Sequence, residues 1–188
     1  MKLHRCVKTK QINQYFGKDK TIPGLLSFYQ SLGILGHNGW DHGTPNNTPF
    51  YFGGESRGLI ESSYWDYYGG NSLHILLSDG EKYYRLRFFH LKDVTVKPGV
   101  WVESGDLLGH TNNTGAGTTG PHLHYDIKEV IKDQHGNYQS INKDNGYGGC
   151  LDPALFDTGI FIKDYMDNLQ AQIGILQKII DLIKGFLK

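Results

Sequence analysis

The chain has 188 residues, which is enough for one domain with a sizeable core and an appended segment. Its 19 basic and 19 acidic side chains balance, so no overall charge favours binding to nucleic acid or to anionic lipid. The 25 glycines and 12 tyrosines favour strands and turns over a helical protein.

Residues 1–36 are expected to form an irregular lead-in that packs on the domain, and no chemistry is visible in them. The chain opens without the apolar run of a secretory signal peptide, and no stretch approaches the roughly 18 apolar residues of a transmembrane helix. Cys6 and Cys150 are the only cysteines, and they are equally compatible with one disulfide and with two buried thiols.

Short β-prone runs alternate with turn signals between residues 49 and 131, which predicts an antiparallel β core. The Asp79-Gly80 pair lies between two apolar-rich runs and predicts a hairpin at that point. The main domain is assigned residues 37–157, and the remainder, 158–188, is assigned to a C-terminal amphipathic segment.

A helix is expected over about residues 161–188, because apolar residues recur there at alternating steps of four and three. These residues form a heptad seam, the apolar stripe of a coiled coil, which consists of Leu169, Ile173, Leu176, Ile180, Ile183 and Leu187. A second apolar stripe consists of Ile175, Ile179, Leu182 and Phe186. Three roles remain open for this helix, namely packing on its own domain, self-association, and binding to a membrane surface.

The stretch "GPHLHYDI" places His122 and His124 one residue apart on a predicted strand. Side chains at alternate positions of a strand share one face, so the two imidazoles face one space while Leu123 and Tyr125 take the other side. Two imidazoles in one space suit a metal site or an acid/base site. Asp126 falls on the same face, either exposed or orienting an imidazole.

The loop "GHNGWDHGTP" offers His37 and Asp41, four residues apart but separated by Gly39. With one histidine of the 122/124 pair they supply three nitrogen and oxygen ligands, the usual set for a catalytic zinc ion with water in the fourth position. The sequence pattern itself does not say which histidine of the pair binds the metal. His42 is assigned to the surface or to a supporting position.

His90, near the end of the predicted strand "RFFHLKD", carries little information when taken alone. In order along the chain, however, "GHNGWD", "FFHL", "GHTNNTGAGTTG" and "GPHLHYDI" resemble the lysostaphin-type zinc metalloendopeptidases of bacterial cell walls. The resemblance covers roughly residues 33–130, with a weaker similarity at "GYGGCLDPALFD". It implies that residues 37–157 form a zinc metallopeptidase domain with a mainly β, lysostaphin-like fold. The predicted C-terminal helix lies outside the resemblance and is appended to this fold.

The resemblance also implies a role for each site residue. His37, Asp41 and His124 match the family's ligands for one Zn²⁺, while His90 and His122 match its two catalytic histidines. The implied reaction is attack of a zinc-bound water on a peptide carbonyl, assisted by these two histidines. Which of the two is the base stays open. The glycine-rich stretch from Gly109 to Gly120 is expected to form a loop beside the site.

Two departures from the family pattern bear on the substrate groove. Phe88 stands where the family usually has a tyrosine, which removes a hydroxyl that could touch substrate. The run "FYFGGESRGLIES" is more aromatic than its counterpart in the family and is expected to reshape the groove wall. Neither change affects a predicted metal ligand.

The leading hypothesis is therefore a zinc endopeptidase that cuts cross-bridges or stem peptides of peptidoglycan, at the bacterial cell wall. The alternatives are a non-hydrolytic wall-binding or regulatory module on the same fold, and a phage virion component that assembles through the helix. The expected partner is a peptidoglycan peptide rather than nucleic acid. Without a visible signal peptide, delivery by a phage, carriage in a virion or another export route is expected.

Overall fold

The computed structural model describes residues 1–186, so Leu187 of the predicted seam lies outside the described residues. The strands are β1 (Leu3–Arg5), β2 (Ile12–Gln14), β3 (Trp40–Gly43), β4 (Pro49–Tyr51), β5 (Gly58–Asp66), β6 (Gly70–Ser78), β7 (Tyr83–Val94), β8 (Trp101–Val102), β9 (Leu107–Thr111), β10 (His122–Lys132), β11 (Tyr138–Ser140), β12 (Cys150–Leu151) and β13 (Asp157–Phe161). The α-helices are α1 (Leu26–Ser31) and α2 (Ile162–Phe186). Three short 3-10 helices are η1 (Lys18–Lys20), η2 (Pro23–Leu25) and η3 (Pro153–Leu155).

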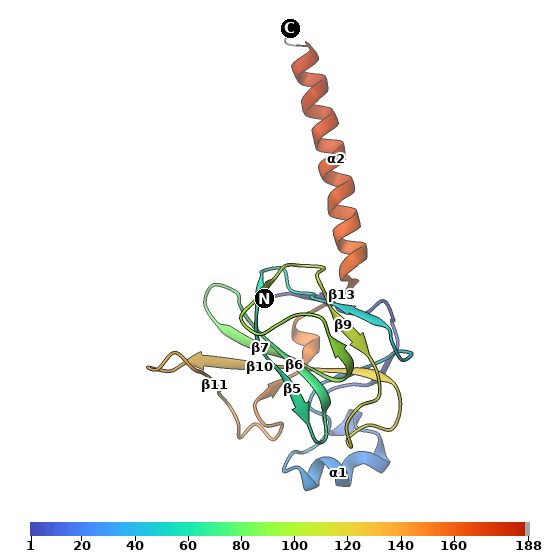
Figure 1. Ribbon diagram of the computed structural model, residues 1–188, viewed down its shortest axis with the longest axis vertical. Coiled ribbons are helices and arrows are strands. Elements are labelled where there is room, and N and C mark those ends of the chain that lie inside the picture. Colours follow the sequence, from blue (N-terminus) through green and yellow to red (C-terminus); the bar gives the residue numbers. More distant parts are fainter. Residues whose placement is uncertain (187–188) are drawn as a thin grey trace.

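One large sheet organises the β body (Figure 1). Its main path runs β2-β3-β10-β7-β6-β5-β8, and every neighbouring pair is antiparallel. A separate pair of parallel strands, β1 and β13, joins the first strand of the chain to the last strand before α2. The predicted class, a mainly β fold with an antiparallel core and a C-terminal helix, is confirmed.

The predicted hairpin at Asp79-Gly80 is present between β6 and β7. The Asp79 side chain accepts hydrogen bonds from the backbone N–H groups of Glu81 and Lys82, which closes the turn. Gly80 has a φ of 100°, a conformation that costs glycine little. The hairpin brings β7, which carries His90, into the centre of the sheet.

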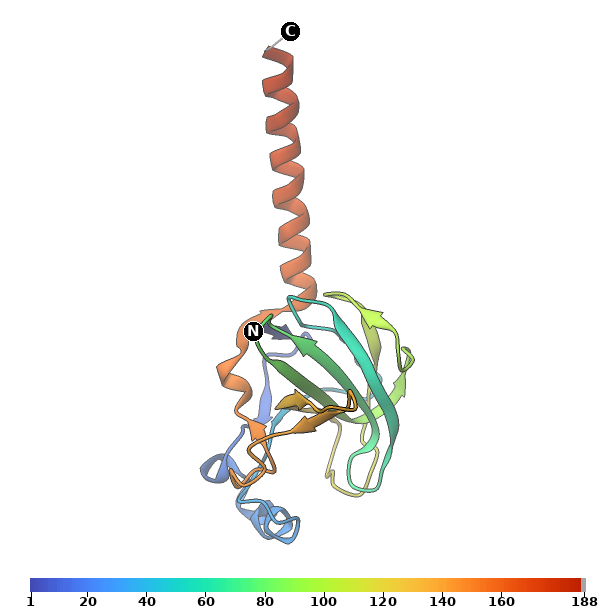
Figure 2. The ribbon, with the colours of Figure 1, turned by 90° about the vertical axis from the view of Figure 1, so that its left-hand side faces the viewer.

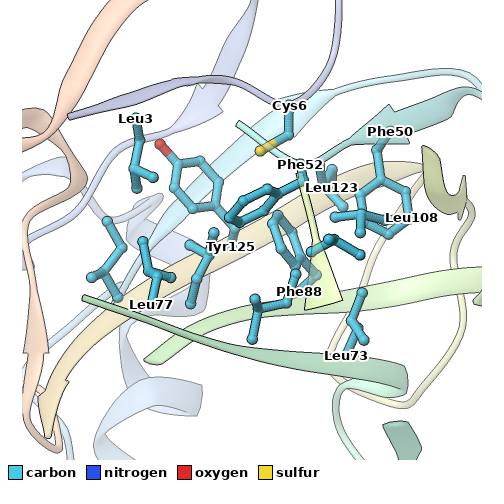
Figure 3. Packing of buried hydrophobic residues seen from close by; sticks show 14 of the residues in the cluster. Leu3, Cys6, Phe50, Phe52, Leu73, Leu77, Phe88, Leu108, Leu123 and Tyr125 are labelled. Carbon is cyan, nitrogen blue, oxygen red and sulfur yellow. The ribbon is translucent and has the colours of Figure 1, made fainter. Parts of the chain in front are cut away.

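Strand β10 shows how one strand serves both the core and the site. Leu123, Tyr125 and Ile127 point into the hydrophobic core, as the period-two pattern predicts. Figure 3 shows Leu123 and Tyr125 packed among the side chains of neighbouring strands. The other face of the strand presents His122 and His124, so burial of the apolar face fixes the orientation of the histidines.

The two expected changes in the groove wall are not found there. Phe88 is fully buried, and its ring lies 5.2 Å from that of Phe50, in the core (Figure 3). Phe50 and Phe52 are also fully buried. Alternation along β7 turns Phe88 inward and leaves its neighbour Phe89 to line the cleft. The prediction that these aromatic residues alter the groove is therefore wrong, because they fill the core.

The N-terminal segment is built into the domain. Leu3, Cys6 and Val7 belong to the hydrophobic core, and β2 extends the sheet by pairing with β3. Cys6 and Cys150 are both buried free thiols, so they do not form a disulfide. The boundaries at residues 37 and 158 stay predictions.

Helix α2 leaves the β body and extends away from it, as Figures 1 and 2 show from two directions. Only its start is anchored, since Ile162 is fully buried and the Tyr165 ring stacks on His4 at 3.9 Å. Residues 170–184 are all exposed, so packing of the whole helix on its own domain is wrong. Within residues 1–186, no helix is long and apolar enough to cross a membrane.

Candidate active site

All five predicted site residues converge on one face of the sheet. His122 and His124 begin β10, and the register places His124 opposite Asp41 of β3. His37 lies in the loop just before β3, and His90 lies in β7, on the other side of β10. Because β10 lies between β3 and β7, three neighbouring strands bring the residues of the separate motifs together.

Three of these residues form a compact group of metal-ligand atoms. The Nε2 atom of His37 lies 3.2 Å from Oδ1 of Asp41 and 3.1 Å from Nδ1 of His124. Asp41 Oδ1 lies 2.8 Å from the same nitrogen of His124. Two imidazoles and one carboxylate are a ligand set that zinc prefers, and it leaves room for a fourth ligand. Within the described residues this is the one such cluster identified.

The orientation of the two imidazoles supports this interpretation. His37 donates from Nδ1 to the backbone carbonyl of Tyr15 at 3.0 Å, which leaves the lone pair of its Nε2 directed at the cluster. The Nε2 atom of His124 lies 3.7 Å from the carboxylate of Asp126, so Nδ1 is the nitrogen that faces the cluster. Such outer partners fix the tautomer of metal-binding histidines. The donor set therefore fits a zinc ion.

The electrostatics of the cluster favour positive charge. Burial opposes ionisation of Asp41, but the neighbouring His37 and His124 hold the pKa of its carboxyl well below the usual range. Burial likewise opposes charge on His124, yet Asp126 and Asp41 raise the pKa of its imidazole to about 9. The two carboxylates that stabilise a proton on this ring also stabilise a cation placed at the cluster.

Two further histidines border the cluster with a shared orientation. His90 donates from Nδ1 to the carbonyl of Thr114 at 2.8 Å, and His122 donates from Nδ1 to the carbonyl of Gly120 at 2.8 Å. Their ring centres are 4.6 Å apart, and His122 Nε2 lies 3.5 Å from Asp41. Burial is the main cause that lowers both pKa values, that of His90 to about 4. Both rings are therefore neutral acceptors at Nε2 near pH 7.

The backbone at His90 adopts an unusual conformation. Its φ is 60°, in the left-handed region that a non-glycine residue rarely occupies. The pairing between β6 and β7 shifts register beside it, and the His90 N–H donates to the carbonyl of Gly69. Left-handed residues of this kind cluster at functional sites, where the surrounding structure holds them in place. The irregularity turns the imidazole toward the cluster.

Gly39, between His37 and Asp41, makes the close approach of their loop to β10 possible. A Cβ atom at this position would lie 2.3 Å from the Tyr125 carbonyl oxygen and 2.8 Å from Nε2 of His124. No larger residue fits without moving β3 away from β10. The interpretation of "HNGWD" as a glycine-shaped loop that aims two ligands at one point agrees with this geometry.

The glycine-rich stretch forms a loop beside the site, as predicted, after its first residues have completed β9. Its main function in the structure is to supply carbonyl groups, since Thr114 and Gly120 accept from the two histidines described above. Gly117 and Pro121 line the cleft directly.

Asp126 and His42 differ from their expected surroundings. Asp126 is fully buried and accepts two hydrogen bonds from the Arg87 guanidinium, at 2.7 and 2.5 Å. It therefore supports His124 and is not a surface residue. His42 is 1% exposed and stacks on Tyr125, with ring centres 5.5 Å apart. The surface alternative for His42 is wrong, because alternation along β3 turns it toward the core.

The cleft above the site has a volume of about 440 Å³, and part of its wall comes from the N-terminal segment. Tyr29 of α1 and Gln14 of β2 both line it, and Gln14 donates to the Tyr29 hydroxyl at 3.0 Å. Across the cleft, the Phe28 ring meets Tyr68 at 5.5 Å. Residues 1–36 carry no motif and reach the cleft only through the tertiary fold, so their sequence predicts no chemistry.

Residues 35–143 match the sequence model of peptidase family M23. The chain belongs to peptidase family M23. This match covers the segment that holds all five candidate site residues. It confirms the resemblance drawn from the four motifs.

Among named relatives, the chain is 37% identical over 109 residues to peptidoglycan DD-endopeptidase ShyA of Vibrio cholerae, covering 58% of this chain and 24% of that protein. It is 32% identical over 108 residues to peptidoglycan DD-endopeptidase ShyC of the same organism, covering 57% and 23%. It is 34% identical over 67 residues to lysostaphin of Staphylococcus simulans, covering 36% and 13%. The chain thus spans about a quarter of the length of the first two M23 relatives.

Solved structures agree on the fold. A zinc-containing peptidase from Vibrio cholerae superposes with a TM-score of 0.57 at 25% identity, covering 81% of this chain and 39% of that one. The catalytic domain of lysostaphin from Staphylococcus simulans superposes with a TM-score of 0.51 at 25% identity, covering 69% and 95%. The expected lysostaphin-like peptidase fold is confirmed.

Proposed function

We propose that this chain is a zinc-dependent endopeptidase that hydrolyses peptide bonds in the cross-bridges or stem peptides of bacterial peptidoglycan. The observation that carries the proposal is the convergence of His37 Nε2, Asp41 Oδ1 and His124 Nδ1, with two further imidazoles beside them. Membership of peptidase family M23 and the names of the relatives support the choice of substrate. The place of action that follows is the cell wall.

In this proposal His37, Asp41 and His124 hold one Zn²⁺. The bound ion supplies Lewis acidity, which polarises the scissile carbonyl and makes a water ligand more acidic. Asp126, anchored by Arg87, keeps the His124 ring in the orientation that binding requires.

His90 and His122 do the proton transfers. Each ring is fixed through Nδ1 to a backbone carbonyl, so each presents Nε2 to the cleft as an acceptor. One Nε2 takes the proton of the attacking water, and the ring protonated in this way donates a hydrogen bond to the oxygen that gains negative charge. The same proton is then available to the departing amine. Because both rings are held through Nδ1 in the same way, either can fill either role in this proposal.

The test is mass spectrometry of fragments released from purified peptidoglycans with different cross-bridges. The zinc-loaded chain should release fragments with new peptide termini, and those termini identify the bond. A chelated sample and the His122→Ala variant should release none. If the zinc-loaded chain releases no fragment from any wall type while its zinc content is stoichiometric, the proposal is wrong and a non-hydrolytic wall-binding module becomes the better account.

A further inference from the structure

The distal part of α2 exposes many large aliphatic side chains. All of residues 170–184 are exposed. Seven aliphatic residues among them, here called the apolar face of α2, are 44 to 64% exposed: Ile173, Ile175, Leu176, Ile179, Ile180, Leu182 and Ile183. Single exposed aliphatic residues are ordinary, whereas a contiguous patch of this kind marks an interaction surface.

The spacing of these residues is that of a helical bundle. Ile173, Leu176, Ile180 and Ile183 follow steps of three and four, the repeat of a coiled-coil seam. The other three residues lie beside that seam, so the apolar arc covers about 180° of the helix at 100° per residue. An arc this wide exceeds the narrow seam of a two-stranded coiled coil.

We propose that the apolar face of α2 binds the same face on further copies of this chain, so that three or more α2 helices form a bundle. The exposed area and the charge of α2 both favour another copy of this chain as the partner.

The exposed area is sufficient for stable assembly. Taken together, the seven residues expose about 700 Å² per copy, so a bundle of three has about 2,100 Å² of this surface to bury, more than the roughly 1,000 Å² expected of a specific interface. Two helices alone would cover the seam and leave Ile175 and Leu182 exposed at its flank. A third helix covers them, which is why more than two copies are required.

Charge favours another copy over a lipid surface. Between residues 170 and 184 the charged side chains are Lys178, Asp181 and Lys184, a net charge of one positive unit. Helices that lie on membranes usually have a polar face rich in lysine and arginine. Here the flank of the seam carries Gln170, Gln177 and a single charge, Lys184, so repulsion between like charges across a bundle is confined to one position.

The direction of α2 is compatible with assembly. The helix extends from the end of the β body opposite α1, the helix that borders the active-site cleft, as both views show (Figures 1 and 2). Assembly through the distal part of α2 therefore leaves the cleft open to substrate. Each copy in the bundle would keep a complete site, because all five candidate residues come from one chain.

The test is the mass of the full chain in solution, measured by sedimentation equilibrium over a wide concentration range. The expected mass is at least three times the 21.2 kDa of one copy. The double variant Leu176→Gln with Ile180→Gln should need at least tenfold higher concentration to associate. The matched control, Lys178→Gln with Asp181→Gln, places two glutamines on the opposite face of the same helix and should keep the mass of the unchanged chain.

Zinc content shows that each variant has kept its β body, and circular dichroism reports the helix. A chain that stays monomeric or stops at a dimer contradicts the proposal, and so does an apolar-face variant that associates as strongly as the control. A chain that is monomeric in solution but co-sediments with phosphatidylglycerol vesicles would assign α2 to a membrane surface instead.

Discussion

The two faces of strand β10 differ in what holds them in place. Leu123, Tyr125 and Ile127 are buried among other apolar groups, and their position follows from the hydrophobic effect. His124 and Asp126 are buried as well, but on the cleft face, where only specific polar partners compensate for lost hydration. The core face therefore determines stability, while the cleft face is the one to which we assign metal binding and chemistry.

The largest expected effect comes from comparing substitutions at two adjacent residues of β10, one on each face. His122→Ala should reduce turnover about 10³-fold, because a general acid/base group is lost, with little change in thermal unfolding temperature. Kinetics on a defined peptidoglycan fragment measures the first quantity and calorimetry the second. A variant that keeps turnover within a few-fold of the unchanged chain would show that His122 does not transfer the proton.

Substitution of the next residue, Leu123→Ala, should lower stability and leave turnover unchanged. Removing a fully buried leucine should lower the free energy of unfolding by about 3 to 4 kcal/mol, because a cavity remains. Turnover per folded, zinc-loaded molecule should stay close to that of the unchanged chain. Denaturant unfolding gives the free energy, and a loss below about 1 kcal/mol would contradict the assignment of Leu123 to the core.

A histidine on the neighbouring strand β6, His74, should also make the stability of the fold sensitive to acid. Burial, and after it the Arg87 cation, lowers the pKa of His74 from 6.5 to about 4. Below about pH 6.5 the unfolded chain binds this proton more readily, so the free energy of unfolding falls as the pH drops toward 4. His74 accounts for about 3 kcal/mol of that loss by pH 4, at 1.36 kcal/mol per pKa unit.

His74→Gln should accordingly reduce the loss of stability between pH 6.5 and pH 4 and leave the pH dependence above pH 7 unchanged. Denaturant unfolding at several pH values measures both. An unaltered acid dependence in this variant would show that His74 is not held neutral by its surroundings.

The smallest expected effect is on zinc affinity, and it comes from comparing two ion pairs on the same sheet. Asp126→Asn should weaken zinc binding about 10- to 100-fold, because the group that orients His124 loses its charge. The matched control is Glu61→Gln, which weakens the Arg85–Glu61 pair away from the ligand cluster. It should leave zinc affinity unchanged, although both variants lose some stability. Equal zinc affinities in the two variants would remove Asp126 from the metal centre.

How much of this could be predicted from the sequence depends on the range of the interactions involved. Alternation along "HLHYDI" is local, so it places His122 and His124 on one face and Leu123 on the other. The sequence pattern alone did not distinguish the metal-binding histidine from the catalytic one. That assignment came from the family resemblance.

The partners of these histidines could not be predicted. The carbonyls of Tyr15 and Thr114 lie more than 20 residues along the chain from the rings they contact, so they meet them only in the folded chain. Gly120 is only two residues from His122, but a backbone carbonyl acceptor leaves no mark in the residue types of a sequence. The burial of Asp126 likewise depends on Arg87 from a neighbouring strand. For α2, the periodicity predicted the helix, but its exposure follows from where it leaves the β body.

The measurement that tests the central claim most directly is the zinc content of purified His122→Ala and His124→Ala, determined by elemental analysis beside the unchanged chain. The account predicts about one zinc per chain in His122→Ala and little or none in His124→Ala, with both variants folded. An empty His122→Ala and a zinc-loaded His124→Ala would reverse the assignment of metal ligand and catalytic residue on β10.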